Sequence, residues 1–400
     1  MTASVQEQLS AFVSTFGTFN LGSGDIDNDL SSDGRARLSP EAAHQLYQQG
    51  AVAEIGAMAH RRRLETVPGN TVTYLIDRNI NYTNVCNSDC SFCGFYRPHS
   101  DDPESYVLNR DELRQKVEEA LELGATRILL QGGHNDDLPY DFYPEMIRWL
   151  SDNFPIELNA FSPSEIHQMH LVSGKSYEDI LIDLQQAGMK GLPGGGAELL
   201  SDAVRKRVSP KKIAADIWIE VMRVAHSLAL TTTATMVIGF GESLEQRIEH
   251  FTRLRDLQDE SLRAGYRGFN AFISWPLQHN ENTSMGRSRH RVNYGADSLH
   301  YLRNVAIGRL FLDNIPHHAA SWPTLGVEVG KLALHFGCDD FGSTMMEENV
   351  VSQAGALTQS KWSMSPEELQ RAIQEAGFEP AQRDSSYAIL QQFGKEVVNG

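Results

Sequence analysis

The 400-residue sequence contains few cysteines, no excess of basic residues and no long apolar run. Four cysteines are too few for the disulfide framework of a small secreted domain, and they suit a reducing compartment. The net charge of −17 argues against a nucleic-acid partner, which usually meets a basic protein face. No stretch approaches the roughly 18–20 apolar residues that cross a bilayer, and the first residues lack the pattern of a secretory signal. We therefore expect a cytoplasmic protein, with neither nucleic acid nor membrane as a partner.

The first 70 residues divide into two segments of different character. Residues 1–38 are polar and show no sustained period, so we expect a loosely ordered extension. Residues 39–70 are predicted to be helical. Ser39 stands at the expected N-cap of this region and Pro40 at its first helical position, where proline lacks no needed hydrogen bond.

From residue 71 onward, apolar strands alternate with amphipathic helices. The strands are rich in β-branched residues and mostly do not alternate apolar with polar side chains, as expected of a parallel sheet buried on both faces. Eight consecutive strand–helix units over residues 71–362 predict an α/β fold, a TIM-type (β/α)8 barrel. Residues 363–400 are expected to add a C-terminal helix and a tail that pack on the barrel. An open doubly wound sheet is the competing architecture.

The most informative stretch is NYTNVCNSDCSFCGFYR, which follows the first predicted strand. It gathers three of the four cysteines within eight residues: Cys86, Cys90 and Cys93. A structural zinc site needs four ligands, so a Cys3His site completed by His99 is one interpretation. An iron–sulfur cluster with four irons ordinarily takes four thiolates, so three thiolates would leave one iron open to a substrate or cofactor.

The segment CNSDCSFC resembles the signature of the radical S-adenosylmethionine (SAM) superfamily, with Phe92 as its aromatic residue. The resemblance implies a radical SAM barrel in which the three cysteines bind a [4Fe-4S] cluster and SAM chelates the open iron. Reduction of the cluster would then cleave SAM to methionine and a 5′-deoxyadenosyl radical. A reductant such as flavodoxin or ferredoxin is the implied electron donor.

Further segments resemble the cyclic dehypoxanthinyl futalosine synthase family of menaquinone biosynthesis. They include LLQGGHNDDL, GLPGGGAELL, TATMVIGFGE, HFGCDDFGSTMMEENVV and PAQRDSSY, and the resemblance covers about residues 38–388. It implies a cyclase that acts on dehypoxanthine futalosine by abstracting hydrogen from the ribose C4′ and joining that carbon to the benzoate ring. Aminodeoxyfutalosine synthase and the deazaflavin FO synthase modules share the cysteine loop and are the nearest alternatives. A non-catalytic protein stabilised by zinc is a remote one.

Polar and glycine-rich clusters stand at the predicted carboxyl ends of the strands, where barrel enzymes place their chemistry. By the resemblance, the candidates for cofactor binding are Phe92, Gln131, Gly132, Gly133, Ser162, Glu165, Gly239 and Gly241. The glycines also fit ordinary turns, and Ser162 with Glu165 also fits an N-capped helix start.

The remaining candidates concern catalysis and the substrate. Candidates for a direct catalytic role, including uptake of the released proton, are His134, His317 and Glu347. Candidates for substrate binding are Arg78, Asn79, Gly195, Asn314, Ser321 and Asn349. An internal salt bridge is the alternative for Arg78, and a solvated position is the alternative for Glu347. His318 would offer a second histidine beside His317.

Overall fold

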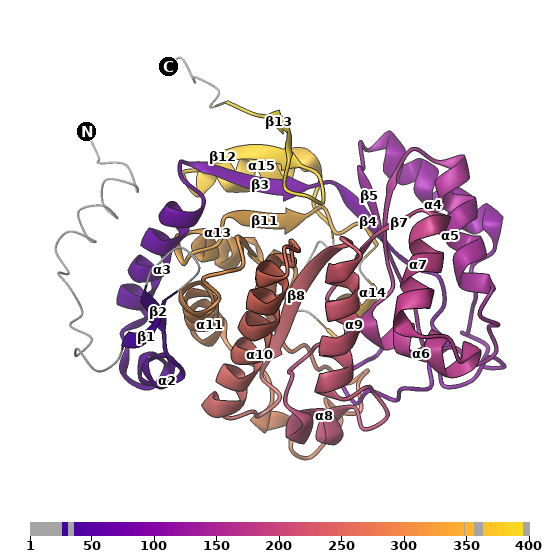
Figure 1. Ribbon diagram of the computed structural model, residues 1–400, viewed down its shortest axis with the longest axis horizontal. Helices are drawn as coiled ribbons and strands as arrows, with labels where there is room; N and C mark the ends of the chain where they lie inside the picture. Colours follow the sequence, from indigo (N-terminus) through magenta and orange to yellow (C-terminus); the bar gives the residue numbers. More distant parts are fainter. Residues whose placement is uncertain (1–25, 31–35, 348, 356–362, 395–400) are drawn as a thin grey trace.

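A parallel barrel forms the centre of the fold, and its first strand is broken in two. The computed structural model describes residues 26–30, 36–347, 349–355 and 363–394 (Figure 1). The halves of the first strand, β3 (Thr71–Leu75) and β4 (Asp77–Asn81), pair with different neighbours. The first half pairs with β11 (Asp340–Ser343) and the second with β5 (Arg127–Gln131), so the sheet curls until both edges meet at this strand.

Five further parallel strands complete the eight positions of the barrel. They are β6 (Glu157–Ala160), β7 (Met189–Leu192), β8 (Thr231–Ile238), β9 (Phe269–Pro276) and β10 (His317–Ala319). Every neighbouring pair from β4 round to β3 is parallel. The prediction of a (β/α)8 barrel is thereby confirmed.

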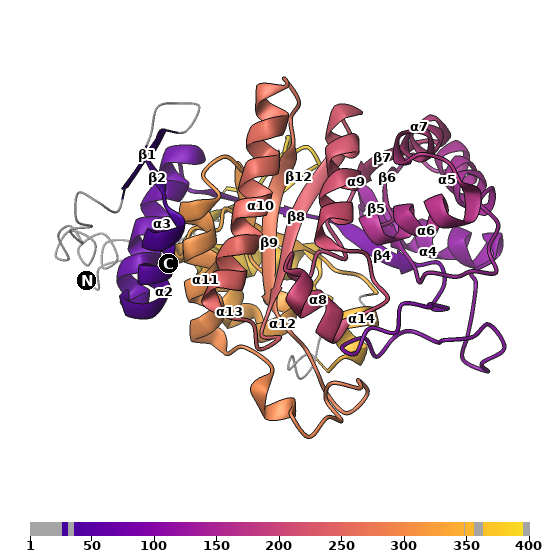
Figure 2. The ribbon, with the colours of Figure 1, turned by 60° about the horizontal axis from the view of Figure 1, so that its bottom comes forward.

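Helices cover the outside of the barrel (Figures 1 and 2). Local capping explains where several of them begin: α4 (Arg110–Glu122) and α10 (Leu244–Arg263) both start with a reciprocal capping box. The other helices that follow strands are α5 (Phe142–Asn153), α6 (Pro163–Ser173), α7 (Tyr177–Ala187), α8 (Asp202–Val208), α9 (Ala215–Ser227), α11 (Ser298–Phe311), α12 (Trp322–Leu325), α13 (Val327–His335), α14 (Asn349–Gln353) and α15 (Pro366–Glu375). A short 3-10 turn, η1 (Arg291–Asn293), lies in the loop after β9.

The N-terminal part packs against one side of the barrel. Within the expected extension, β1 (Ile26–Leu30) and β2 (Ala36–Leu38) form an antiparallel pair; residues 1–25 and 31–35 lie outside the described residues. The helical region consists of α2 (Pro40–Gln49) and α3 (Val52–Thr66), and the Ser39 hydroxyl caps α2 by accepting from the Ala42 amide at 3.1 Å. Both helices contact α11.

The C-terminal part extends the sheet beyond the barrel, which the sequence did not reveal. After α15, β12 (Glu379–Arg383) runs parallel to β3, and β13 (Ile389–Gln392) returns antiparallel to β12 (Figure 1). The turn between them crosses the amino-terminal end of the barrel, where the Asn270 amide on β9 donates to the Ser385 carbonyl at 3.1 Å. In the part of the chain that the structure describes, no helix is long and apolar enough to cross a membrane.

Candidate active site

A cavity of about 440 Å³ runs along the interior of the barrel. Alternate residues of the strands line it, because successive side chains of a strand point to opposite faces of the sheet. On β5, for example, Arg127, Leu129 and Gln131 face the cavity. Its carboxyl-terminal end contains the three clustered cysteines, and its amino-terminal end is lined by Arg383, at the end of β12, and by Ser385 and Tyr387 from the turn that follows. The cavity therefore has two chemically different ends.

The cysteine loop is held in place by backbone hydrogen bonds to three separate segments. The Cys86 amide donates to the Arg97 carbonyl at 2.8 Å, and the Asn87 amide donates to the His134 carbonyl at 3.0 Å. The Ser91 amide donates to the Val208 carbonyl at the end of α8, at 2.9 Å. These bonds fix the loop over the cavity.

The donor set fits a cluster with one open iron. Cys86, Cys90 and Cys93 all line the cavity, whereas Cys338 is fully buried elsewhere, just before β11. Among the described residues, no three Cys, His, Asp or Glu side chains lie close enough together to hold a single metal ion. The zinc site completed by His99 is therefore not found. A cluster of four irons spreads its thiolate ligands more widely than one tetrahedral ion does.

Gly132 and Gly133 let the end of β5 approach the cysteine loop closely. A Cβ on Gly132 would lie 2.5 Å from the Tyr82 ring, and one on Gly133 would lie 2.0 Å from the Val85 carbonyl oxygen. No larger residue fits at Gly133 without moving the backbone that carries Cys86. Both glycines line the cavity, and they do so because the cysteine loop packs directly on them.

Glu165 is a buried carboxylate on the cavity wall with three hydrogen-bond donors. Its Oε1 accepts from the Tyr82 hydroxyl and from the Gly132 amide, both at 2.9 Å, and its Oε2 accepts from the Ser162 hydroxyl at 2.8 Å. Burial raises the pKa of Glu165 to about 7, although these hydrogen bonds act in the opposite direction. The Glu165 carboxyl can therefore gain or lose a proton near neutral pH. Ser162 also caps α6, as its N-cap position predicted.

His134 lies on the cavity wall beside the cysteine loop. Its Nδ1 is 2.8 Å from the Ser88 hydroxyl. Burial, together with the positive charge of Lys212, lowers the pKa of His134 to about 3. The imidazole is therefore neutral at physiological pH.

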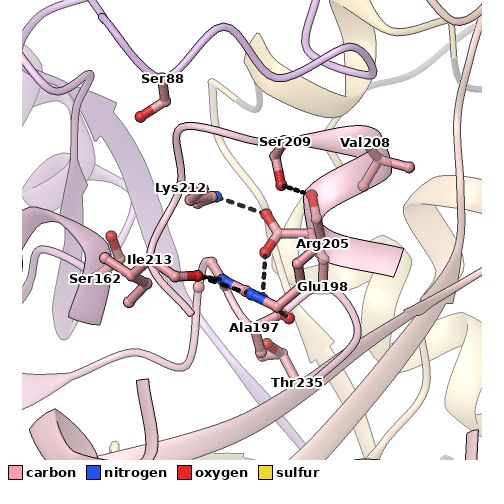
Figure 3. A network of polar contacts seen from close by, with 12 residues as sticks. Ser88, Ser162, Ala197, Glu198, Arg205, Val208, Ser209, Lys212, Ile213 and Thr235 are labelled. Carbon is pink, nitrogen blue, oxygen red and sulfur yellow. Dashed lines mark hydrogen bonds and ion pairs between the residues drawn. The ribbon is translucent and has the colours of Figure 1, made fainter. Parts of the chain in front are cut away.

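An ion network beside the cysteine loop was missed in the sequence (Figure 3). The Lys212 Nζ lies 2.6 Å from Glu198 Oε1, and Arg205 lies 3.7 Å from Glu198 Oε2. Arg205 is fixed by hydrogen bonds to the carbonyls of Ala197 at 2.5 Å and Ile213 at 2.7 Å. Lys212 and Glu198 line the cavity. Burial lowers the pKa of Lys212, but the interactions with Glu198 and Cys90 raise it by more, so the pKa is raised overall. The basic run AVRKRVSPKKI was the signal that could have revealed it.

Ten of the predicted cofactor, catalytic and substrate residues line the cavity together with the cysteines. They are Asn79, Phe92, Gln131, Gly132, Gly133, His134, Ser162, Glu165, Gly195 and Ser321. Phe92 also packs edge-on against Phe240, with 5.3 Å between the ring centroids. These residues come from five strands or the loops after them, namely β4, β5, β6, β7 and β10, and barrel closure brings them to one site.

Two predicted residues face away from the cavity and pair with each other. Arg78 Nε donates to Glu347 Oε2 at 2.7 Å, and Arg78 Nη1 donates to Glu119 of α4 at 2.6 Å. Lys116, also of α4, bonds the other oxygen of Glu347. Alternation along β4 explains the position, because Asp77 and Asn79 point inward and Arg78 therefore points outward. The internal salt bridge considered for Arg78 is what the structure shows.

The predicted position of Asn314 and His317 at the carboxyl-terminal end of a strand was wrong. The strand is His317–Ala319, so Asn314 precedes it and only Ser321 follows it at the carboxyl-terminal end. His317 is bonded to Asp339 at 2.6 Å and stacks on Tyr387 with 3.7 Å between ring centroids. Asn314 donates to Asp259 at 2.7 Å on the outside of the barrel. His318 is fully buried against Phe272 and does not line the cavity.

Three other predicted residues lie near the cavity without lining it. Gly239 and Gly241 have positive φ angles of 103° and 71°, and Gly239 accepts a hydrogen bond from the Gly295 amide at 2.7 Å. They shape the turn after β8 for packing against the loop that follows β9. Asn349 begins α14 and donates to Asn81 Oδ1 at 3.2 Å, and Asn81 itself lines the cavity.

An α/β barrel whose cavity carries three cysteines at its carboxyl-terminal end defines a class of barrel enzyme with a cluster-binding loop. Comparison with known proteins identifies that class: residues 80–254 match the radical SAM superfamily, and residues 266–395 match the CofH/MqnC C-terminal region. The crystal structure of methylornithine synthase has the same fold, with a TM-score of 0.67 at 13% identity over 86% of this chain and 94% of that chain.

Closer relatives define the family. The cyclic dehypoxanthine futalosine synthase of Halalkalibacterium halodurans is 45% identical over 89% of this chain and 92% of its own length. The protein of the same name from Streptomyces coelicolor is 40% identical over 88% of this chain and 86% of its own length. The chain belongs to the radical SAM family of cyclic dehypoxanthine futalosine synthases, and the resemblance found in the sequence is confirmed.

Proposed function

We propose that this protein is a cytoplasmic radical SAM cyclase that converts dehypoxanthine futalosine to its cyclic product in menaquinone biosynthesis. The observation that carries the proposal is the three-cysteine loop over a barrel cavity, in a chain 45% identical to a cyclic dehypoxanthine futalosine synthase. When bound and reduced, the [4Fe-4S] cluster and SAM supply a 5′-deoxyadenosyl radical. Abstraction of the ribose C4′ hydrogen yields 5′-deoxyadenosine and a carbon radical, which adds to the benzoate ring.

The chain's own residues bind the cofactors and position the substrate. Cys86, Cys90 and Cys93 would hold the cluster, and Lys212 offers the SAM carboxylate a cation beside Cys90. Of the three cations that line the cavity, Arg127 and Arg383 lie at the opposite end. The cavity wall would keep C–H and S–H donors in solution away from the radical, which they would otherwise quench.

The new C–C bond is completed when the cyclised radical loses one electron and one proton; the oxidised cluster, when bound, would take the electron back. Of the three residues predicted for catalysis, only His134 lines the cavity. His134 is a weak base because of its low pKa, whereas the pKa of Glu165 near 7 suits a group that takes up a proton at neutral pH. We therefore assign proton uptake to Glu165, in addition to the role in cofactor binding that was predicted for it.

The first electron would come from a small acidic protein of the flavodoxin or ferredoxin kind. Two basic segments flank the cysteine loop, although the whole chain carries a net charge of −17. In the first segment the Val208 carbonyl accepts from the Ser91 amide. In the second, the Met285 amide donates to the Ser91 carbonyl at 2.8 Å. The exposed cations beside these two contacts are Lys206, Arg207, Lys211, Arg287, Arg289 and Arg291. Complementary charge would steer an acidic donor to this face.

Anaerobic incubation with SAM, a reductant and dehypoxanthine futalosine tests the proposal. The expected products are 5′-deoxyadenosine and a compound two hydrogens lighter than the substrate, both identified by mass spectrometry. An aminodeoxyfutalosine synthase would instead leave the adenosyl group in its product. The variant Cys90→Ala should lose iron and turnover together. Absence of any product that depends on dehypoxanthine futalosine would contradict the assignment.

A further inference from the structure

The amino-terminal end of the cavity contains buried polar atoms that the protein leaves unpaired. Asp77 is 2% exposed and Asn159 is 5% exposed, and both line the cavity. Oδ1 of each side chain accepts no hydrogen bond from the described residues, and Nε of Arg127 donates none. A buried polar atom without a partner costs free energy, so this part of the cavity is built for a polar ligand.

The same region is closed by the turn that follows β12. Arg383 makes two hydrogen bonds to Asp340, at 2.5 and 3.0 Å, and its guanidinium lies 3.9 Å from the Tyr387 ring centroid. Ser385 is bonded to Asn159 at 3.4 Å, and its carbonyl accepts from Asn270 at 3.1 Å. The turn therefore contacts β6, β9 and β11 and gives the cavity a floor. We use "floor subsite" for the part lined by Asp77, Arg127 and Asn159.

The charges at this end are balanced. Arg127 pairs with Asp77, and Arg383 pairs with Asp340. No net positive charge remains to attract an anion, and the free oxygens of Asp77 and Asn159 require hydrogen-bond donors. An ionised carboxylate has no donor, whereas a sugar hydroxyl can donate to these oxygens and accept from Arg127 Nε.

We propose that the floor subsite binds the sugar hydroxyls of the substrate, with Asp77 and Asn159 as acceptors and Arg127 as donor. The inference rests on the proposed function, because dehypoxanthine futalosine joins a ribose, which has donors, to a benzoate, which is only an acceptor when ionised. The ribose hydroxyls therefore face the floor, and the ribose C4′, which loses the hydrogen, faces the end of the cavity that contains the cysteines.

Binding to the reconstituted, SAM-loaded enzyme without reductant tests this orientation, since no turnover occurs. The variant Asn159→Leu keeps the side-chain shape and removes the amide. We expect it to raise the Kd of dehypoxanthine futalosine about tenfold, the usual effect of one lost hydrogen bond in a buried site. The matched control is Asn270→Leu, which loses the same kind of bond to Ser385 but does not line the cavity. Its Kd should stay within about twofold of the wild type.

Ligand analogues make the test independent of how well the variants fold. With wild-type enzyme, an analogue lacking one ribose hydroxyl should bind about tenfold more weakly, and Asn159→Leu or Asp77→Asn should discriminate less between the two ligands. A benzoate fragment without the sugar should bind both proteins equally. Equal weakening in Asn159→Leu and Asn270→Leu, or selective loss of the benzoate fragment, would overturn the proposal.

Failure of the proposed function would look different. A simple pentose tested alone should bind the wild type more tightly than Asn159→Leu. If that difference appears but no cyclic product forms on reduction, the floor subsite stands and the assigned reaction falls. If cyclic product forms while neither the pentose nor the substrate distinguishes the two proteins, the reaction stands and the floor subsite falls.

Discussion

The hydroxyl of Tyr82 donates a 2.9 Å hydrogen bond to Glu165, which joins the first barrel strand to the start of α6 inside the cavity wall. Tyr82 is fully buried, and Glu165 is 4% exposed. Because its burial raises the pKa of Glu165 to about 7, the folded protein binds a proton there more tightly than the unfolded chain.

This pKa sets a direction for the effect of pH on stability. Below the ordinary pKa of 4.5 the Glu165 carboxyl is protonated in both states; between about pH 4.5 and 7 only the folded state keeps the proton. The contribution of Glu165 to the free energy of unfolding therefore falls by about 1 kcal/mol per pH unit in that window. Glu165→Gln should be more stable than the wild type at pH 8 and closer to it at pH 5. Urea unfolding at both pH values measures this, and a pH-independent difference would contradict it.

Gly133→Ala should disrupt the cysteine loop. Its added Cβ would lie 2.0 Å from the Val85 carbonyl oxygen and 2.8 Å from the Cys86 Cβ, so the loop must shift. We expect anaerobic reconstitution to incorporate less than about half of the wild-type iron, because all three thiolates must be in place together. Gly394→Ala is the control, since a Cβ there meets no atom within 4 Å. Normal iron content in Gly133→Ala would show that the loop adapts.

Lys212→Met should weaken SAM binding. It removes the cation of the cavity nearest the cysteine end and leaves Glu198 with Arg205 alone. Loss of one charged hydrogen bond corresponds to about a tenfold higher Kd for SAM. Its exposed neighbour provides the control, Lys211→Met, which should bind SAM as the wild type does. Equilibrium dialysis of the anaerobic protein measures both; equal Kd values for the two variants would exclude this role.

Arg78→Met should affect stability more than turnover. Arg78 bonds Glu119 and Glu347 outside the barrel and does not line the cavity. An ion network that includes an exposed carboxylate contributes only modestly to the free energy of unfolding. We expect a lower melting temperature with turnover within about threefold of the wild type. A loss of turnover of a hundredfold or more, with unchanged SAM and iron binding, would restore a direct role for Arg78.

Arg289→Glu should slow electron delivery by a protein donor without slowing delivery by dithionite. Arg289 is exposed in the loop bonded to Ser91 through Met285. Reversing one charge at a docking surface lowers an electrostatically steered rate about tenfold at low salt, and added salt should reduce the difference. Arg61→Glu on α3 is the control with an identical charge change at an exposed site. Stopped-flow reduction by flavodoxin compares them, and equal slowing of both variants would point to net charge alone.

The sequence by itself determined the barrel and the grouping of three cysteines in one loop, because both follow from local patterns. Each strand–helix unit is recognisable from a short apolar run followed by a capped helix, as at Asn109 before α4 and Ser243 before α10. The three cysteines lie within one loop, so their spacing alone fixes the number of thiolates available. Glycines beside that loop were also found, although the reason for them, close packing on Tyr82 and Val85, was not visible.

Only the tertiary structure decided which side of a strand each polar residue faces and what it meets there. The ends of short strands are predicted only to within a few residues. For this reason His317 and Asn314 were expected at the carboxyl-terminal end of their strand, whereas they lie at the amino-terminal end of β10. Arg78 meets Glu347 from 269 positions away, and Asp340 meets Arg383 from 43 positions away, because closing the barrel brings these strands together. Such contacts depend on the path of the whole chain, which no local pattern records.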